Sequence, residues 1–96
     1  MALDTGRSMS EPIATVVAPG GELTLKLRSD RPGVQVYNSV WTNVPVPGLG
    51  GKHYGKHAGF CLEDQAFADA VRNPHFPNVI YSPDRAYSHW CEFEIA

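Results

Sequence analysis

The chain has 96 residues, so it forms at most one domain with one modest hydrophobic core. With 43% hydrophobic residues, its composition is typical of a globular protein and excludes a disordered one. Eight basic and ten acidic residues give a net charge of −2 without a basic patch, and no apolar run approaches the roughly 20 residues of a membrane span, so we expect neither nucleic acid nor a membrane as a partner.

The cysteines and the N-terminal residues bear on the cellular compartment. Cys61 and Cys91 lie in separate expected strands, and neither belongs to a Cys-x-x-Cys pair or a zinc-like spacing. We expect two reduced, mostly buried thiols, with a disulfide between adjacent strands as the open alternative. The N-terminus shows no long apolar segment after a basic one, so no secretory signal is visible and we expect a cytoplasmic protein.

The first third of the chain predicts a tail and a hairpin. Residues 1–11 are polar and lack apolar periodicity, which predicts a flexible tail, and residues 12–96 are expected to form a single β-domain. Residues 13–17 are rich in β-formers, residues 18–21 have turn chemistry, and residues 22–28 alternate leucines with polar side chains. This pattern predicts a hairpin whose second strand has one buried and one solvated face.

The next strand follows a Pro-Gly turn and carries a candidate binding residue. Pro32 fixes one dihedral angle of the turn, and Gly33 is free to take a positive φ. Val34 and Val36 form the apolar side of the strand, which leaves Gln35 on the opposite side. Two interpretations of Gln35 are open: its amide binds a ligand, or it simply faces solvent.

The middle of the chain is expected to be a loop without a metal site. Residues 43–51 contain two prolines and three glycines, which exclude a helix or a central strand. His53 and His57 have a spacing that would form a metal pair on a helix, but the neighbouring glycines argue against that helix. His57 is instead expected to make a structural hydrogen bond near the strand that carries Glu63, with a lesser binding role open.

Residues 59–65 place one carboxylate, Glu63, at the end of an apolar run that predicts a buried strand. With a period of two, Phe60 and Leu62 point to one face, and Cys61 and Glu63 point to the other. A carboxylate desolvated on such a face favours its neutral form and gains the proton affinity of a general base. The alternative is an ordinary strand-end acid, solvated or paired with a nearby Lys or Arg.

The last third predicts further short strands. Residues 66–72 allow one turn of helix, which the following Asn-Pro ends, and strands are expected at 79–81 and 86–95 around a turn at 82–85. The mixed faces of the last strand predict an edge position or a covered second face. About six short strands and no convincing helix predict an all-β sheet or sandwich.

An ordered series of short motifs carries a resemblance to a known family. The motifs are Arg31-Pro32-Gly33-Val34-Gln35-Val36-Tyr37-Asn38, Gly50-Gly51-Lys52, Lys56-His57-Ala58-Gly59-Phe60-Cys61-Leu62-Glu63-Asp64-Gln65 and Asn73-Pro74-His75-Phe76-Pro77-Asn78. In this order, residues 23–93 resemble the C-terminal portion of the aldose 1-epimerases, or galactose mutarotases. The resemblance implies part of a galactose mutarotase-like β-sandwich (supersandwich), with antiparallel strands and long loops.

The resemblance also implies a chemistry, the cofactor-free and metal-free interconversion of the α and β anomers of an aldohexose such as galactose or glucose. In the family, a carboxylate removes the proton of the anomeric hydroxyl while a histidine protonates the ring oxygen; the ring opens, the C1–C2 bond rotates, and the ring closes again. Glu63 matches the family's base, and Gln35 matches its sugar-contacting glutamine.

The departures from the family leave two hypotheses. The motifs of the acid histidine and of the other sugar-contacting residues are absent, and no such role transfers to His53, His57, His75 or His89. The chain is then an incomplete mutarotase, or it is a non-catalytic β-sandwich module for carbohydrate binding or assembly. Part of a larger sandwich exposes an apolar face and unpaired edges, so we expect a homo-oligomer or a complementing chain that completes the sheet.

Overall fold

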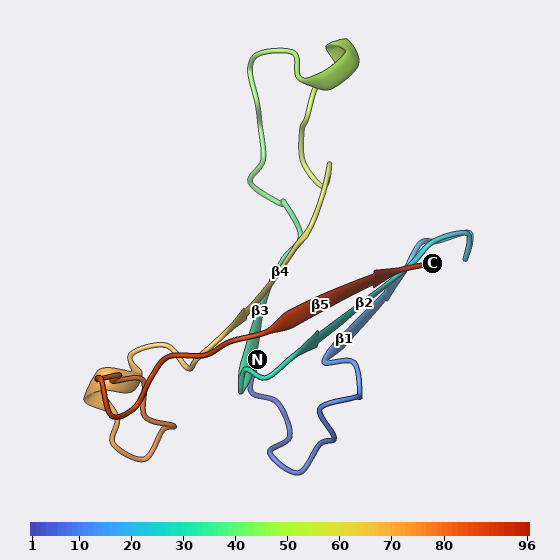
Figure 1. Cartoon of the computed structure of the whole chain (residues 1–96). Coiled ribbons are helices and arrows are strands. Elements are labelled where there is room, and N and C mark those ends of the chain that lie inside the picture. The colour runs from blue at the N-terminus through green and yellow to red at the C-terminus, as the bar shows by residue number, and fades with distance from the viewer.

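The computed structural model describes residues 1–96 and contains only strands, short turns and loops (Figure 1). The elements are β1 (Ala14–Val17), β2 (Thr24–Ser29), β3 (Gly33–Tyr37), β4 (Cys61–Gln65) and β5 (Cys91–Ile95), with 3₁₀ turns η1 (Leu49–Gly51) and η2 (Ala70–Arg72). The strands form two antiparallel sheets, one with the order β1-β2-β5 and one made of β3 and β4. The expected all-β class with antiparallel strands and long loops is confirmed.

The three-stranded sheet has one apolar and one charged face. The hairpin of β1 and β2 forms as predicted, with Gly21 at a φ of 76° in its turn. Leu27 pairs with Phe93 of β5, and Leu25 pairs with Ile95, so these side chains share the apolar face. β5 has no second neighbour, which places it at the edge, one of the two positions expected for it.

The opposite face is joined by charge pairs between β2 and β5. Lys26 Nζ lies 3.0 Å from Glu94 Oε1, and Arg28 Nη1 lies 2.9 Å from Glu92 Oε1 and 2.8 Å from Glu94 Oε2. Hydrogen bonds from Arg28 and Lys26 lower the pKa of the Glu94 carboxyl. These pairs stabilise the register of the edge strand, because a slip of one residue would move its apolar side chains to the charged face.

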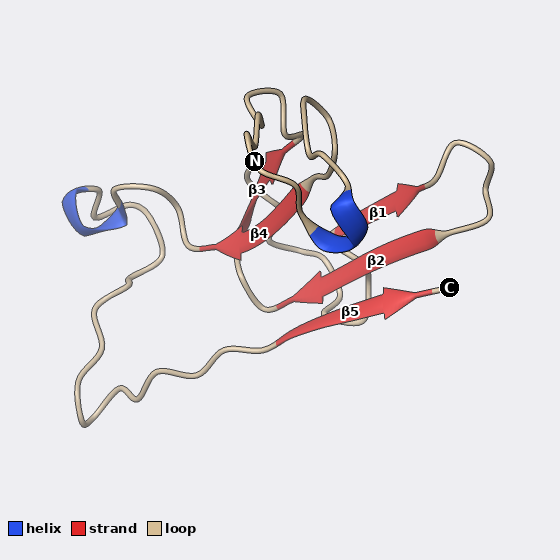
Figure 2. Cartoon of the chain, turned by 90° about the horizontal axis from the view of Figure 1, so that it is seen from above, coloured by secondary structure: helices blue, strands red, loops and turns tan.

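The β3–β4 ribbon extends away from the first sheet (Figures 1 and 2). It continues into the loop that carries η1, and Figure 1 shows this loop as an arm standing clear of the other strands. Gly33 begins β3 and does not take a positive φ, contrary to the expectation for the turn. Its missing side chain serves close packing instead, because a Cβ there would lie 3.2 Å from the carbonyl oxygen of Met1 and 3.3 Å from that of Gln65.

The N-terminal residues, expected to be a tail, lie against the start of β3. Ala2 forms an isolated bridge with Gly33, and the Met1 amino group donates to the Val34 carbonyl at 2.8 Å. The Arg7 guanidinium donates to the carbonyls of Ser29 and Arg31 at 3.0 and 2.8 Å. These contacts satisfy backbone groups that would otherwise face solvent at the end of β2.

Residues 66–90 contain fewer strands than expected. No strand forms at 79–81, and only the end of the expected strand at 86–95 is regular, as β5. The Arg85 guanidinium donates to the carbonyls of Ile80 and Asn78, so a side chain takes the place of a neighbouring strand. The rings of Phe67 and Phe76 pack edge to face at 5.1 Å within this segment.

The chain buries little of itself. Only 5 of 96 residues are buried, with Leu27 and Val34 as the hydrophobic ones. The accessible surface is 7114 Å², against about 5,400 Å² for a compact monomer of 10.5 kDa. The radius of gyration is 16.9 Å, against about 12.5 Å for a compact domain of this length. None of the helical turns has the length and apolar character required to cross a membrane.

Candidate functional site

The two site residues expected from the sequence meet across the β3–β4 ribbon. Gln35 and Glu63 are direct partners in the antiparallel register. Directly opposed residues project to the same face with Cβ atoms about 4.5–5.5 Å apart. The ribbon therefore presents a carboxylate beside an amide, an arrangement in which one group accepts a proton while the other donates and accepts hydrogen bonds.

This face of the ribbon is open. Both Gln35 and Glu63 are exposed, and the Glu63 carboxylate makes no hydrogen bond or ion pair. The burial expected for a general base is thus absent, because none of the 96 residues covers this face. In this chain Glu63 is the solvated acid that was the alternative interpretation. No histidine contacts Glu63, so the chain itself places no acid beside the base.

His57 has the structural role expected of it. Its ring Nδ1 lies 2.9 Å from the Asn38 carbonyl oxygen, just beyond the end of β3, and its backbone N–H donates to the Ser39 carbonyl at 3.0 Å. His57 has a φ of 62°, so these bonds hold it in the left-handed region. They close the base of the arm next to β4, the strand that carries Glu63.

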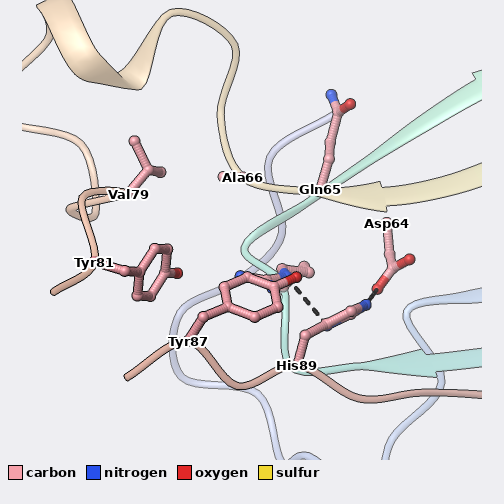
Figure 3. Close-up of a pocket in the computed structure, with 8 residues that line it drawn as sticks. Asp64, Gln65, Ala66, Val79, Tyr81, Tyr87 and His89 are labelled. Atoms are coloured by element: carbon pink, nitrogen blue, oxygen red, sulfur yellow. Dashed lines mark hydrogen bonds and ion pairs between the residues drawn. The ribbon is translucent and has the colours of Figure 1, made fainter. Parts of the chain in front are cut away.

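A pocket lies where β4 meets the segment before β5 (Figure 3). Its lining residues are Arg31, Asp64, Gln65, Ala66, Val79, Tyr81, Tyr87 and His89. Figure 3 shows the Asp64 side chain directed toward His89, whereas the Gln65 side chain points the other way. Since side chains alternate along a strand, the Asp64 side chain and Glu63 lie on opposite faces of β4.

A cluster of Asp30, Asp64, His89 and Cys91, which we call the junction cluster, joins the two sheets. His89 Nδ1 lies 2.7 Å from Asp30 Oδ1, and His89 Nε2 lies 3.2 Å from Asp64 Oδ2. The Ser29 hydroxyl donates to Asp64 Oδ2. The ligand atoms of Asp64, His89 and Cys91 all lie within 4.8 Å of one another.

Sequence reasoning missed the junction cluster. Metal-binding motifs are visible in a sequence when the ligands lie at close spacing, whereas these residues come from three distant segments. The available signal was the placement of His89 and Cys91 on one face of the last expected strand, but only the tertiary arrangement brings Asp64 to them.

Both cysteines are free and exposed, so the expectation of buried thiols is wrong. Cys61 pairs with Tyr37 in the β3–β4 ribbon, whereas Cys91 pairs with Ser29 in the other sheet. The two thiols therefore belong to different sheets, and the disulfide between neighbouring strands that the sequence left open is not formed.

The sequence is similar to a known protein family and to several curated proteins. The sequence model of the family described as Aldose 1-epimerase matches residues 2–94. Galactose mutarotase from Bos taurus is 40% identical over 85 residues, which are 86% of this chain and 25% of the relative. Galactose mutarotase from Homo sapiens is 40% identical over 74 residues, covering 75% and 22% of the two chains. Aldose 1-epimerase from Haemophilus influenzae is 27% identical over 91 residues, covering 93% and 26%.

The matches cover most of this chain but only part of each relative. No solved structure matches the chain at a significant level. The chain spans about a quarter of the length of the curated relatives it matches, and it corresponds to their C-terminal portion. The family model covers nearly the whole chain, including the N-terminal residues that lie against β3. The chain therefore belongs to the aldose 1-epimerase family.

Proposed function

We propose that this chain supplies the base end of a mutarotase active site, which interconverts the α and β anomers of aldohexoses such as galactose and glucose. Glu63 is the general base, and Gln35 holds a hydroxyl of the sugar. The register of β3 and β4, which sets Gln35 directly opposite Glu63, is the observation that carries this proposal. A polyol needs such a mixture of acceptor and donor groups on one surface.

The proposed reaction balances its protons within the site. Glu63 takes the proton from the anomeric hydroxyl, and an acid supplied from outside this chain protonates the ring oxygen as its bond to C1 breaks. Rotation about C1–C2 turns the aldehyde, and ring closure returns both protons. No oxidant, metal or cofactor is required by these steps.

The acid must come from another polypeptide part, which also covers Glu63. Exposed Phe93 and Ile95 on the apolar face of β5, together with the open face of the ribbon, support a second copy or a complementing chain as that partner. Two free cysteines are consistent with a reducing compartment, so we place the assembled protein in the cytoplasm.

Complementation tests the catalytic proposal. The chain is mixed with bovine galactose mutarotase truncated before its matched C-terminal region, and the mutarotation of fresh α-D-glucose and α-D-galactose is followed by polarimetry. Only the mixture is expected to exceed the buffer rate. Glu63→Gln, which keeps the shape of the side chain, is expected to lower the rate about 10²–10⁴-fold.

Thr15→Ala, an exposed change in β1, is the matched control and is expected to keep the rate. A mixture in which Glu63→Gln is as active as wild type rules out Glu63 as the base. A chain that binds its complement without activity favours the second candidate, a non-catalytic carbohydrate-binding or assembly module. That candidate is supported by the exposure of Glu63 and by the absence of a histidine contact to it.

A further inference from the structure

We propose that the junction cluster binds a Zn²⁺ ion through Asp64, His89 and Cys91, with water as the fourth ligand. The three side chains offer one oxygen, one nitrogen and one sulfur atom, all within 4.8 Å of one another. A mixed set of this kind, with tetrahedral geometry, is what zinc prefers in proteins. The site lies on the opposite face of β4 from Glu63 and is independent of the function proposed for that residue.

The distances fit after a small adjustment of one side chain. Tetrahedral zinc with ordinary bond lengths places a nitrogen and an oxygen ligand about 3.3 Å apart, and a sulfur and a nitrogen ligand about 3.6 Å apart. His89 Nε2 and Asp64 Oδ2 are already 3.2 Å apart. The thiol of Cys91 is exposed, so its rotation can close the remaining gap of at most about 1.2 Å.

Asp30 already orients the histidine as a metal ligand requires. Zinc binding at Nε2 requires the tautomer with the proton on Nδ1, and in that tautomer Nδ1 donates to the Asp30 carboxylate 2.7 Å away while the Nε2 atom lies 3.2 Å from Asp64 Oδ2. Carboxylate–histidine–zinc triads have this arrangement. In the structure Arg31 Nε donates to His89 Nδ1 at 3.1 Å, a contact that the zinc-binding tautomer gives up, while Arg31 Nη2 keeps its bond to the Tyr87 hydroxyl at 2.6 Å.

The charges around the site favour a cation. Asp30, Asp64 and a Cys91 thiolate bring three negative charges to the junction, against the single positive charge of Arg31. The side chains of Asp64 and His89 are 15% and 24% exposed, so they are partly shielded from solvent. The exposed Cys91 leaves a route by which a metal ion can reach them. Zinc bound here would link β4 to the segment that leads into β5, and so join the two sheets.

The test is metal titration of the whole chain under reducing conditions, with Co²⁺ as a spectroscopic substitute. We expect one Co²⁺ per chain, a thiolate-to-cobalt charge-transfer band in the near ultraviolet, and displacement of that band by Zn²⁺. Cys91→Ser is expected to remove the band, and Cys61→Ser, the matched change at the other free cysteine, is expected to keep it. His89→Gln is expected to weaken binding at least tenfold.

Asp30→Asn tests the orienting contact, and we expect it to weaken binding about 10- to 100-fold while the band keeps its position. Circular dichroism checks that each variant retains the wild-type fold, and Cys91→Ser, an exposed and conservative change, decides the result if His89→Gln does not fold. Failure of the wild type to bind Co²⁺ or Zn²⁺ overturns the proposal, and so does a band that survives Cys91→Ser or is lost in Cys61→Ser. In those cases His89 is only an ion-paired link between two carboxylates.

Discussion

The pairing of β3 with β4 sets the positions of Gln35 and Glu63 but does not bury the Glu63 carboxylate. Alternation along each strand predicts that each side chain faces away from its apolar neighbours, and the register then brings the two together. Neither the periodicity of the strand nor the residue type predicts that Glu63 is exposed, because burial of a side chain depends on which other segments cover its face of the ribbon. The carboxylate is positioned by its own strand pair and would be desolvated only by a partner.

At Gln35, we expect Gln35→Ala to lower kcat/KM for galactose about tenfold in the complemented protein. The lost amide makes hydrogen bonds whose net value is about 0.5–1.5 kcal/mol, and 1.4 kcal/mol corresponds to a factor of ten. Initial rates over a range of galactose concentrations measure the change, with Thr15→Ala as the control. An unchanged kcat/KM would remove Gln35 from the sugar site.

At Gly33, we expect Gly33→Ala to release the N-terminal residues, because a Cβ there meets the carbonyl oxygens of Met1 and Gln65. The Val34 N–H, which donates to the Met1 carbonyl at 3.0 Å, should then lose protection from hydrogen exchange. Gly55→Ala is the control, since a Cβ at Gly55 meets nothing within 4 Å. Equal exchange in the two variants would mean that residues 1–11 behave as the flexible tail expected from their composition.

Among the elements, β5 depends most on charge. It pairs only with β2, and the contacts of Glu94 with Arg28 and Lys26 lie on the outer face of that pair. The alternation of β2 predicted this division into an apolar and a charged face. The shorter length of β5 was not predicted, because residues 86–90 have strand-like composition but no strand beside them.

The lowered pKa of Glu94 gives the β2–β5 pair a pH dependence. A carboxyl whose pKa is lower in the folded state stabilises that state above its unfolded pKa, and the contribution is lost as the pH falls through the folded value. We therefore expect β5 to loosen below about pH 4.5, the ordinary value for this carboxyl. Nuclear Overhauser contacts between Leu27 and Phe93, followed from pH 6 to about pH 2, report the change.

Glu94→Gln should remove most of this pH dependence, and Glu22→Gln, a change at an exposed acid in the β1–β2 turn, should leave it intact. Contacts that weaken over the same pH range in Glu94→Gln would assign the transition to another carboxyl.

For the whole molecule, the deficit of buried surface predicts association. The accessible surface exceeds that of a compact monomer by about 1,700 Å², comparable to the total surface buried by a standard protein–protein interface. Phe93 and Ile95 are 54% and 68% exposed on the apolar face of the three-stranded sheet. An exposed sheet face with an unpaired edge favours contact with another chain.

In sedimentation velocity, we expect the wild-type chain to sediment as a concentration-dependent oligomer. Phe93→Lys combined with Ile95→Lys should shift it toward monomer, because charge on this face opposes burial. Val71→Lys, at a residue of η2 that is 71% exposed, is the matched control and should not change association. A wild-type chain that remains monomeric at all concentrations would contradict the proposal that it is completed by a partner.

The sequence by itself determined the elements that depend on residues close together in the chain. Alternating side chains defined the strands around Leu25, Gln35 and Glu63, and proline and glycine defined the loops, because both signals depend on backbone geometry within a few residues. The ordered motifs determined the family. Only the tertiary structure decided the register of Gln35 against Glu63, the loss of the strand at 79–81, and the gathering of Asp30, Asp64, His89 and Cys91. These features depend on which distant segments meet, and pairing between strands is set by contacts that no local pattern contains.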